Sequence, residues 1–320
     1  MAPLVLAGSV LAAAVGLLAP PRTSDDAYRY VWDGRVQAAG ISRYAHTPDD
    51  PTLARLRDEG LFPAGDGCAT WDERRTAAGD CTRINRPAVH TIYPPVAEAW
   101  FLAAHPFGGG VRGAQAGGAL LAVATTGVLL AAGSRRRAAL WGWCPGVTVW
   151  AVNDAHVDTL GALLMVAGLG CTARRRAGVG GALLGAAVAT KLLPALALPG
   201  AASGLLARRP TKGALLVLSA ALGTFAAAYL PYVAVSGVGV LGYLPGYLRE
   251  EGYEQGHLER FGLLRVLLPD RWAAWAAALA LGAVVLGAVV LWVLRRGDPH
   301  RPRTELAEHK CFSIATDIQG

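Results

Sequence analysis

The stretch AQAGGALLAVATTGVLLAAGSRRR, residues 114–137, decides the fold class of this 320-residue chain. Its first part, 114–133, carries no charge, and a helix needs about 20 predominantly apolar residues to cross the hydrocarbon core of a bilayer. Three arginines follow, as is typical of a short cytoplasmic loop. In the whole chain 53% of residues are apolar and only 17% are charged. An ordinary soluble domain, with about 25% charged residues, is therefore excluded.

Seven further uncharged apolar runs accompany this stretch. They are residues 3–19, 138–152, 159–171, 179–190, 192–207, 213–235 and 272–294. We predict an all-α polytopic membrane protein with about eight transmembrane helices. The four runs between residues 138 and 207 are too short to span a bilayer alone, unless polar residues at their ends lie inside the protein and line a cavity.

Loop charge predicts the orientation of these helices, because short cytoplasmic loops collect lysine and arginine. Eight crossings that begin with the N-terminus inside place all the basic clusters in the cytoplasm: residues 135–137, 174–176, 208–212 and 295–303. Most of the positive excess that gives the chain its net charge of +7 then lies in cytoplasmic loops. The charge therefore gives no reason to expect a nucleic-acid partner. A cleaved signal peptide is the alternative for residues 3–19, but this run has no positive n-region and no A-x-A site.

The threading divides the chain into segments on alternating sides of the plasma membrane. They are helix 1 (1–19), an extracytoplasmic loop (20–113), helices 2–7 (114–235), a second extracytoplasmic loop (236–270), helix 8 (271–294) and a cytoplasmic polar tail (295–320). Residues 153–158 and Lys191 also face outside. We expect the chemistry on this extracytoplasmic face, where the acids near the membrane gather.

The first extracytoplasmic loop contains three predicted helices. Residues 23–25 start an amphipathic helix that should lie against the membrane surface and end at Gly40, and a short second helix runs from Pro51 to Gly60. The apolar stretch 96–107 is predicted to lie in the membrane interface, because a spanning helix there would put three arginine clusters outside. Cys68 and Cys81 lie in the same loop, where an oxidising compartment favours a disulfide.

Candidate catalytic carboxylates lie at the start of this loop, in SDDAYRYVWDGR, residues 24–35. They are Asp25, Asp26 and Asp33, accompanied by Tyr30, Arg29 and Arg35. Either Asp25 or Asp26 could merely cap the helix, which would leave the other free. A carboxylate at a helix N-terminus stays ionised, as a general base requires.

Two more polar groups interrupt the apolar runs. NDAHVD, residues 153–158, places Asp154, His156 and Asp158 two apart, so an irregular turn facing a polar cavity is predicted rather than a regular helix. One histidine and two aspartates without further ligand spacing indicate a metal site only weakly. Lys191 lies outside against the general charge bias, which favours an anionic partner such as a phosphate over a snorkelling lysine. In the last outer loop His257 and Arg260 belong to a lid or acceptor surface, or are simply solvated.

Four motifs in matching order resemble the GT-C superfamily of integral-membrane glycosyltransferases, and most of all the actinobacterial polyprenol-phosphate-mannose-dependent mannosyltransferases of glycosyltransferase family 87. The motifs are DDAYRYVWDGRVQAAGI (25–41), INRPAVHTIYPPVAEAWF (84–101), WCPGVTVWAVNDAHVD (143–158) and AVATKLLPALALP (187–199). The resemblance implies that a sugar, mannose, passes from a polyprenyl phosphate to a glycan or lipoglycan acceptor on the outer face of the bilayer.

The resemblance also implies roles for individual residues. The essential acid would be Asp26 by its spacing to Tyr30, with Asp25 as the alternative. Tyr93 would border the cavity, and His156 and Asp158 would form its second polar wall. Apart from the resemblance, the charge that a leaving phosphate needs leads us to expect that Lys191 and one of three arginines, Arg29, Arg35 or Arg260, stabilise it. The lipid-linked donor is a substrate, so no cofactor is expected, and a divalent metal stays open.

One alternative function and one departure from the family accompany this prediction. Short broken spans with polar junctions also occur in transporters and flippases, although the two halves of the chain show no evident internal repeat. The chain turns polar after Arg295, where relatives continue through further membrane helices, so residues 295–320 could mark a C-terminal truncation.

Overall fold

The computed structural model describes residues 1–65, 68–206, 212–244, 246 and 272–296. In this part of the chain all regular elements are helical apart from one short two-stranded sheet, which is consistent with the all-α prediction. The main bundle contains α1 (Ala2–Gly16), α4 (Val111–Ala131), α5 (Arg135–Gly142), η2 (Val147–Asn153), α6 (Asp158–Ala173), α7 (Ala177–Val188), η3 (Leu193–Ala197), α8 (Leu198–Ala201), α9 (Lys212–Ser236), η4 (Gly237–Leu241) and α12 (Trp272–Arg296).

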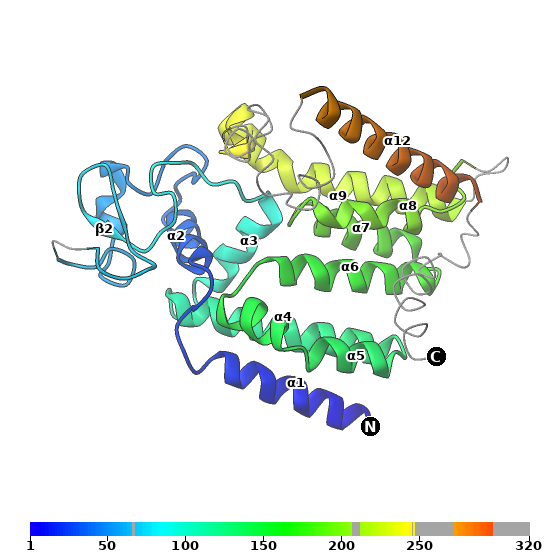
Figure 1. The fold of residues 1–320 in the computed structure, drawn as a ribbon, viewed down its shortest axis with the longest axis horizontal. Helices are drawn as coiled ribbons and strands as arrows, with labels where there is room; N and C mark the ends of the chain where they lie inside the picture. The colour runs from blue at the N-terminus through cyan, green and yellow to red at the C-terminus, as the bar shows by residue number, and fades with distance from the viewer. Residues whose placement is uncertain (66–67, 207–211, 245, 247–271, 297–320) are drawn as a thin grey trace.

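A separate lobe lies beyond one end of the bundle, on the left of Figure 1. It is built from α2 (Asp26–Ala38), η1 (Pro51–Leu56), β1 (Arg74–Arg75) and β2 (Cys81–Thr82), with α3 (Pro95–Ala104) between lobe and bundle. The strands are antiparallel, with Arg74 opposite Thr82 and Arg75 opposite Cys81. The lobe therefore corresponds to the predicted first extracytoplasmic loop.

Each predicted apolar run falls on one or more of the bundle helices, but eight crossings are not shown. By length and composition two helices could cross a membrane, Val111–Ala131 and Lys212–Leu241, among the described residues. A third span results if η2 and α6, which meet at a bend of 110°, count as one. The run 138–152 differs from a simple helix, because α5 ends at Gly142 and a π-helical turn begins at Val147.

Contacts between distant segments define the two ends of the bundle. At one end the Arg174 guanidinium donates to the carbonyl of Ala131 (2.6 Å), and the Leu206 amide donates to that of Leu294 (3.0 Å). At the other end the Val96 amide donates to the carbonyl of Ala189 (3.0 Å). The arginine clusters that follow α4 and α6 are thus at the end away from the lobe, as the predicted threading requires.

Glycines allow close approach at the centre of the bundle, where α7 packs against both α6 and α9. A Cβ at Gly181 would overlap the Val217 carbonyl oxygen, and one at Gly185 would overlap that of Ala221. Small residues at such contacts let helix backbones meet, which replaces hydrophobic driving force within a bilayer. The Gly181 and Gly185 pair therefore fixes the distance between α7 and α9.

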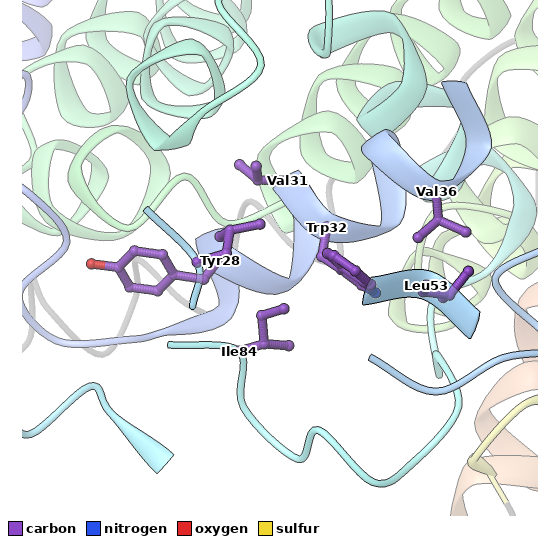
Figure 2. Packing of buried hydrophobic residues seen from close by; sticks show 7 residues of the cluster. Tyr28, Val31, Trp32, Val36, Leu53 and Ile84 are labelled. Atoms are coloured by element: carbon purple, nitrogen blue, oxygen red, sulfur yellow. The ribbon is translucent and has the colours of Figure 1, made fainter. Parts of the chain in front are cut away.

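Helix α2 is the core of the lobe rather than an amphipathic helix on the membrane surface. Figure 2 shows the side chains of Trp32 and Val36 pointing from α2 toward Leu53, and Tyr28 and Ile84 belong to the same buried cluster. The opposite side of α2 packs on α3, where Gly34 meets the carbonyl of Phe101. The predicted surface helix was wrong because α2 has packing partners on both sides, which bury even Arg29 and Asp33.

Replacing Gly185 by alanine should destabilise the bundle. The added methyl group has no room against the α9 backbone, and overpacking of this kind costs about 1 to 3 kcal/mol of unfolding free energy. Gly223→Ala on α9 is the matched control, because nothing lies within 4 Å of its added Cβ. Thermal unfolding in detergent should show a lower Tm for Gly185→Ala only. Equal Tm values would contradict the proposed contact.

Candidate active site at the start of α2

Asp25 and Asp26 lie at the N-terminus of α2, and neither carboxylate caps the helix. The Ser24 hydroxyl instead accepts the Asp26 amide at 3.3 Å. The Asn85 amide nitrogen, Nδ2, lies 2.6 Å from Asp26 Oδ1 and 3.1 Å from Asp25 Oδ1. The remaining oxygens differ in partner, since Asp25 Oδ2 forms an ion pair with Arg74 and Asp26 Oδ2 lies 3.5 Å from His156 Nδ1.

These partners give two neighbouring carboxylates different chemical character. Asp25 is neutralised by a guanidinium and only 14% of its side chain is exposed. The side chain of Asp26 is 28% exposed and faces an imidazole. Because the arginine already occupies one oxygen of Asp25, whereas Asp26 has no arginine partner among these contacts, Asp26 is the better candidate for a general base.

An aromatic wall borders Asp26 and His156. The Tyr30 hydroxyl lies 3.5 Å from His156 Nδ1, and its ring stacks on Phe101 with a centroid distance of 4.4 Å. Tyr93 meets Tyr30 edge-on at 5.0 Å. Burial raises the pKa of the Tyr30 hydroxyl, and the charge of Asp26 raises it further; burial likewise raises the pKa of Tyr93. Both hydroxyls therefore stay protonated at neutral pH.

The NDAHVD turn is irregular, as predicted. Its first polar residues bind the segment between α1 and α2, and its last ones contact the candidate site. Ala155 adopts a left-handed φ of 54° between η2 and α6. Asn153 Nδ2 donates to the carbonyls that end α1, including that of Gly16 at 3.1 Å. Asp154 is fully buried and accepts the backbone amides of Arg22 (3.1 Å) and Thr23 (3.2 Å). This half of the motif thus holds the chain that leads into Asp25 and Asp26.

The other half of the motif faces the candidate site. His156 contacts Asp26, and Asp158 Oδ2 lies 2.8 Å from Lys191 Nζ. The Lys191 and Asp158 side chains are 40% and 50% exposed, so the pair is accessible. The charge of Asp158 also contributes to the raised pKa of Tyr30. Lys191, Asp158, His156 and Asp26 are therefore brought together from three distant segments.

The two predicted phosphate-binding arginines of α2 have partners inside the lobe. Arg29 is buried and pairs with Asp33 at 3.2 Å, while Arg35 pairs with Asp58 and donates to the Leu56 carbonyl at 2.9 Å. In this arrangement both guanidiniums stabilise the lobe. His257 and Arg260 lie outside the described residues.

The sequence interpretation missed a buried polar network beside the site. Glu98 on α3 accepts hydrogen bonds from Thr91 (2.8 Å) and Gln37 (2.9 Å), and its Oε2 lies 3.2 Å from Arg43 Nε. Arg43 also lies over the ring of Tyr232 on α9, 4.1 Å from its centroid. Burial raises the pKa of Glu98, and the charge of Asp33 raises it further. The only sequence signal was a carboxylate interrupting an apolar stretch.

A disulfide between Cys68 and Cys81 fixes the strand pair of the lobe. Cys81 begins β2, which pairs with β1, and β1 carries Arg74. The crosslink therefore supports the ion pair between Arg74 and Asp25. In the part of the chain that the structure describes, no group of three or more His, Cys, Asp or Glu side chains is arranged to hold a metal ion.

The bundle is thus apolar and carries a polar, carboxylate-bearing site at one end. The family model for glycosyltransferase family 87 matches residues 91–307, more than half of the chain. The chain belongs to this family and is an integral-membrane glycosyltransferase. This family membership does not favour the transporter alternative. The match includes His156, Asp158 and Lys191 and begins after Asp26. Neither a curated protein nor a solved structure matches the chain.

Thiol labelling should separate the four cysteines that the structure describes into two groups, whereas Cys311 lies outside the described residues. We expect maleimide to label Cys144 and Cys171 in denatured, unreduced protein, because both are free thiols. Cys68 and Cys81 should label only after reduction, since they are joined to each other. Peptide mapping by mass spectrometry measures both groups in one experiment. Labelling of Cys68 and Cys81 without reductant would exclude the disulfide.

Proposed function

We propose that the protein transfers a hexose, mannose, from a polyprenyl-phosphate-sugar to a hydroxyl of an extracytoplasmic glycan or lipoglycan. The observation that carries this proposal is the Asp26 carboxylate, which faces His156 rather than an arginine at the lobe end of the bundle. Family membership supplies the reaction class, and the resemblance supplies the donor. The threading of the arginine clusters supports a location of the site outside the plasma membrane.

In the proposed step Asp26 acts as the general base. Its Oδ2 atom takes the proton of an acceptor hydroxyl while the oxygen of that hydroxyl attacks the anomeric carbon. The bond between the anomeric carbon and the phosphate oxygen breaks, and polyprenyl phosphate leaves with the bonding electron pair. One displacement at the anomeric carbon inverts its configuration.

Lys191 is the proposed partner of the leaving phosphate. Its ammonium group is accessible, and its ion pair with Asp158 lies on the same turn as His156. An exposed ion pair contributes only about 0 to 1 kcal/mol, so a phosphate can displace Asp158 or join the pair. A positive charge in a site that closes to water stabilises the developing charge strongly.

Replacing Asp26 by asparagine should abolish most of the transfer. Loss of a general base lowers the rate by about 100- to 10,000-fold, whereas the hydrogen bond from Asn85 can be retained by the Asn side-chain oxygen. The measurement is polyprenyl phosphate release from polyprenyl-phosphate-mannose by purified protein, with a synthetic alkyl mannoside as acceptor. Asp25→Asn is the matched control and should stay within about tenfold of wild type, because Asp25 is bound to Arg74. Wild-type turnover by Asp26→Asn would refute the assignment.

Replacing Lys191 by glutamine tests the phosphate partner. Loss of one donor aimed at developing charge costs about 3 kcal/mol, so kcat should fall by about 100-fold. Lys212→Gln is the control, because this lysine begins α9 at the end of the bundle away from the lobe. Its kcat should be unchanged. Equal kcat values for the two variants would exclude Lys191 from the reaction.

A further inference from the structure

We infer that Asn85 is a positioning residue that holds the Asp26 carboxylate and directs one of its oxygens toward the acceptor; this inference rests on the proposed function of Asp26. The Asn85 amide lies 2.6 Å from Asp26 Oδ1. With Oδ1 engaged, Oδ2 is the oxygen that faces His156. The hydrogen bond therefore selects which oxygen is free to accept a proton.

The side-chain amide of Asn85 matches the two carboxylates that it faces. Asparagine carries two N–H donors on one nitrogen, and Asn85 Nδ2 is within hydrogen-bond distance of both Asp25 and Asp26. Two adjacent carboxylates repel each other, and Arg74 neutralises only Asp25. The amide thus holds both carboxylates through neutral hydrogen bonds and brings no second positive charge to Asp26.

The loop that carries Asn85 is held on both sides. Ile84 is fully buried in the core of the lobe beside Trp32. On the other side Arg29 donates to the carbonyls of Arg86 (3.5 Å) and Val89 (3.1 Å). The buried guanidinium that sequence reasoning assigned to phosphate binding therefore anchors the loop that positions Asn85.

The Asp26 carboxylate is faced by groups from each neighbouring element. Asp25 lies beside it at the helix start, Asn85 on the loop and His156 on the turn before α6. The hydroxyls of Tyr30 and Tyr93 are close enough to feel its charge. Of these, Asn85 is the neutral donor to the carboxylate, and its replacement removes a hydrogen bond of the kind that favours the charged form.

The test compares pH profiles of kcat for Asn85→Asp and Asn85→Leu. Both variants keep the approximate size of asparagine and remove the donor, and Asn85→Asp adds a negative charge. The acid limb of the profile should move up by about one pH unit, so kcat on that limb falls by about tenfold and recovers at higher pH. The donor KM should stay within about twofold of wild type, because transition-state stabilisation alone is lost. An acid limb that stays in place in both variants would overturn the inference.

Thr82→Val is the matched structural control. The Thr82 hydroxyl accepts the Ile84 amide at 3.2 Å and donates to the Leu61 carbonyl at 2.9 Å, so its loss loosens the same loop without touching Asp26. Its Tm in detergent should fall while its acid limb stays in place. A limb that moves as far in Thr82→Val as in the Asn85 variants would show general loosening and overturn the inference.

The Asp26→Asn variant distinguishes this inference from the proposed function. Wild-type turnover by Asp26→Asn would show that Asp26 is not the general base, and it would refute the proposed mechanism. Suppose instead that Asp26→Asn is inactive and that the acid limb does not move in the Asn85 variants. This result would support Asp26 as the general base and refute only the role of Asn85.

Discussion

The hydrogen bonds that the buried Asp154 carboxylate accepts from the amides of Arg22 and Thr23 are the constraint on which the site depends. They fix the segment between α1 and α2 to the turn that also carries His156. A buried carboxylate is costly unless its oxygens are satisfied, and here backbone amides and the Thr23 hydroxyl satisfy them. The same six-residue turn therefore sets where α2 begins and which group Asp26 faces.

Helix α2 transmits this constraint into the lobe. Its buried polar side chains bind groups outside the helix, since Arg29 donates to the Val89 carbonyl at 3.1 Å and Gln37 donates to Glu98 at 2.9 Å. Breaking one partner of such a buried pair leaves an uncompensated group, so the helix is held in one rotation about its axis. That rotation directs Tyr30 to His156 and leaves Asp25 and Asp26 at the exposed end.

The sequence could predict those features that follow from local pattern. Uncharged runs and arginine clusters predicted the helices of the bundle, and alternating polar residues in NDAHVD predicted its irregular turn. Burial of α2 on both sides could not be predicted, because η1, the Ile84 loop and α3 approach it from distant parts of the chain. The partners of Arg29 and Asn85 depend on the same long-range packing, so composition alone suggested a phosphate site for an arginine that stabilises a loop.

Exposure explains why Lys191, and not Arg29, suits an exchangeable anion. Arg29 is 3% exposed and bound to Asp33 and two carbonyl groups, so moving it to a phosphate would leave a buried carboxylate unpaired at a cost of about 3 to 5 kcal/mol. The Lys191 side chain is 40% exposed and its partner Asp158 can return to water. A ligand that arrives and leaves in every turnover needs a cation whose resting partner is cheap to displace. The accessible Lys191–Asp158 pair meets that requirement. The buried Arg29–Asp33 pair is suited instead to a fixed scaffold for the proposed base.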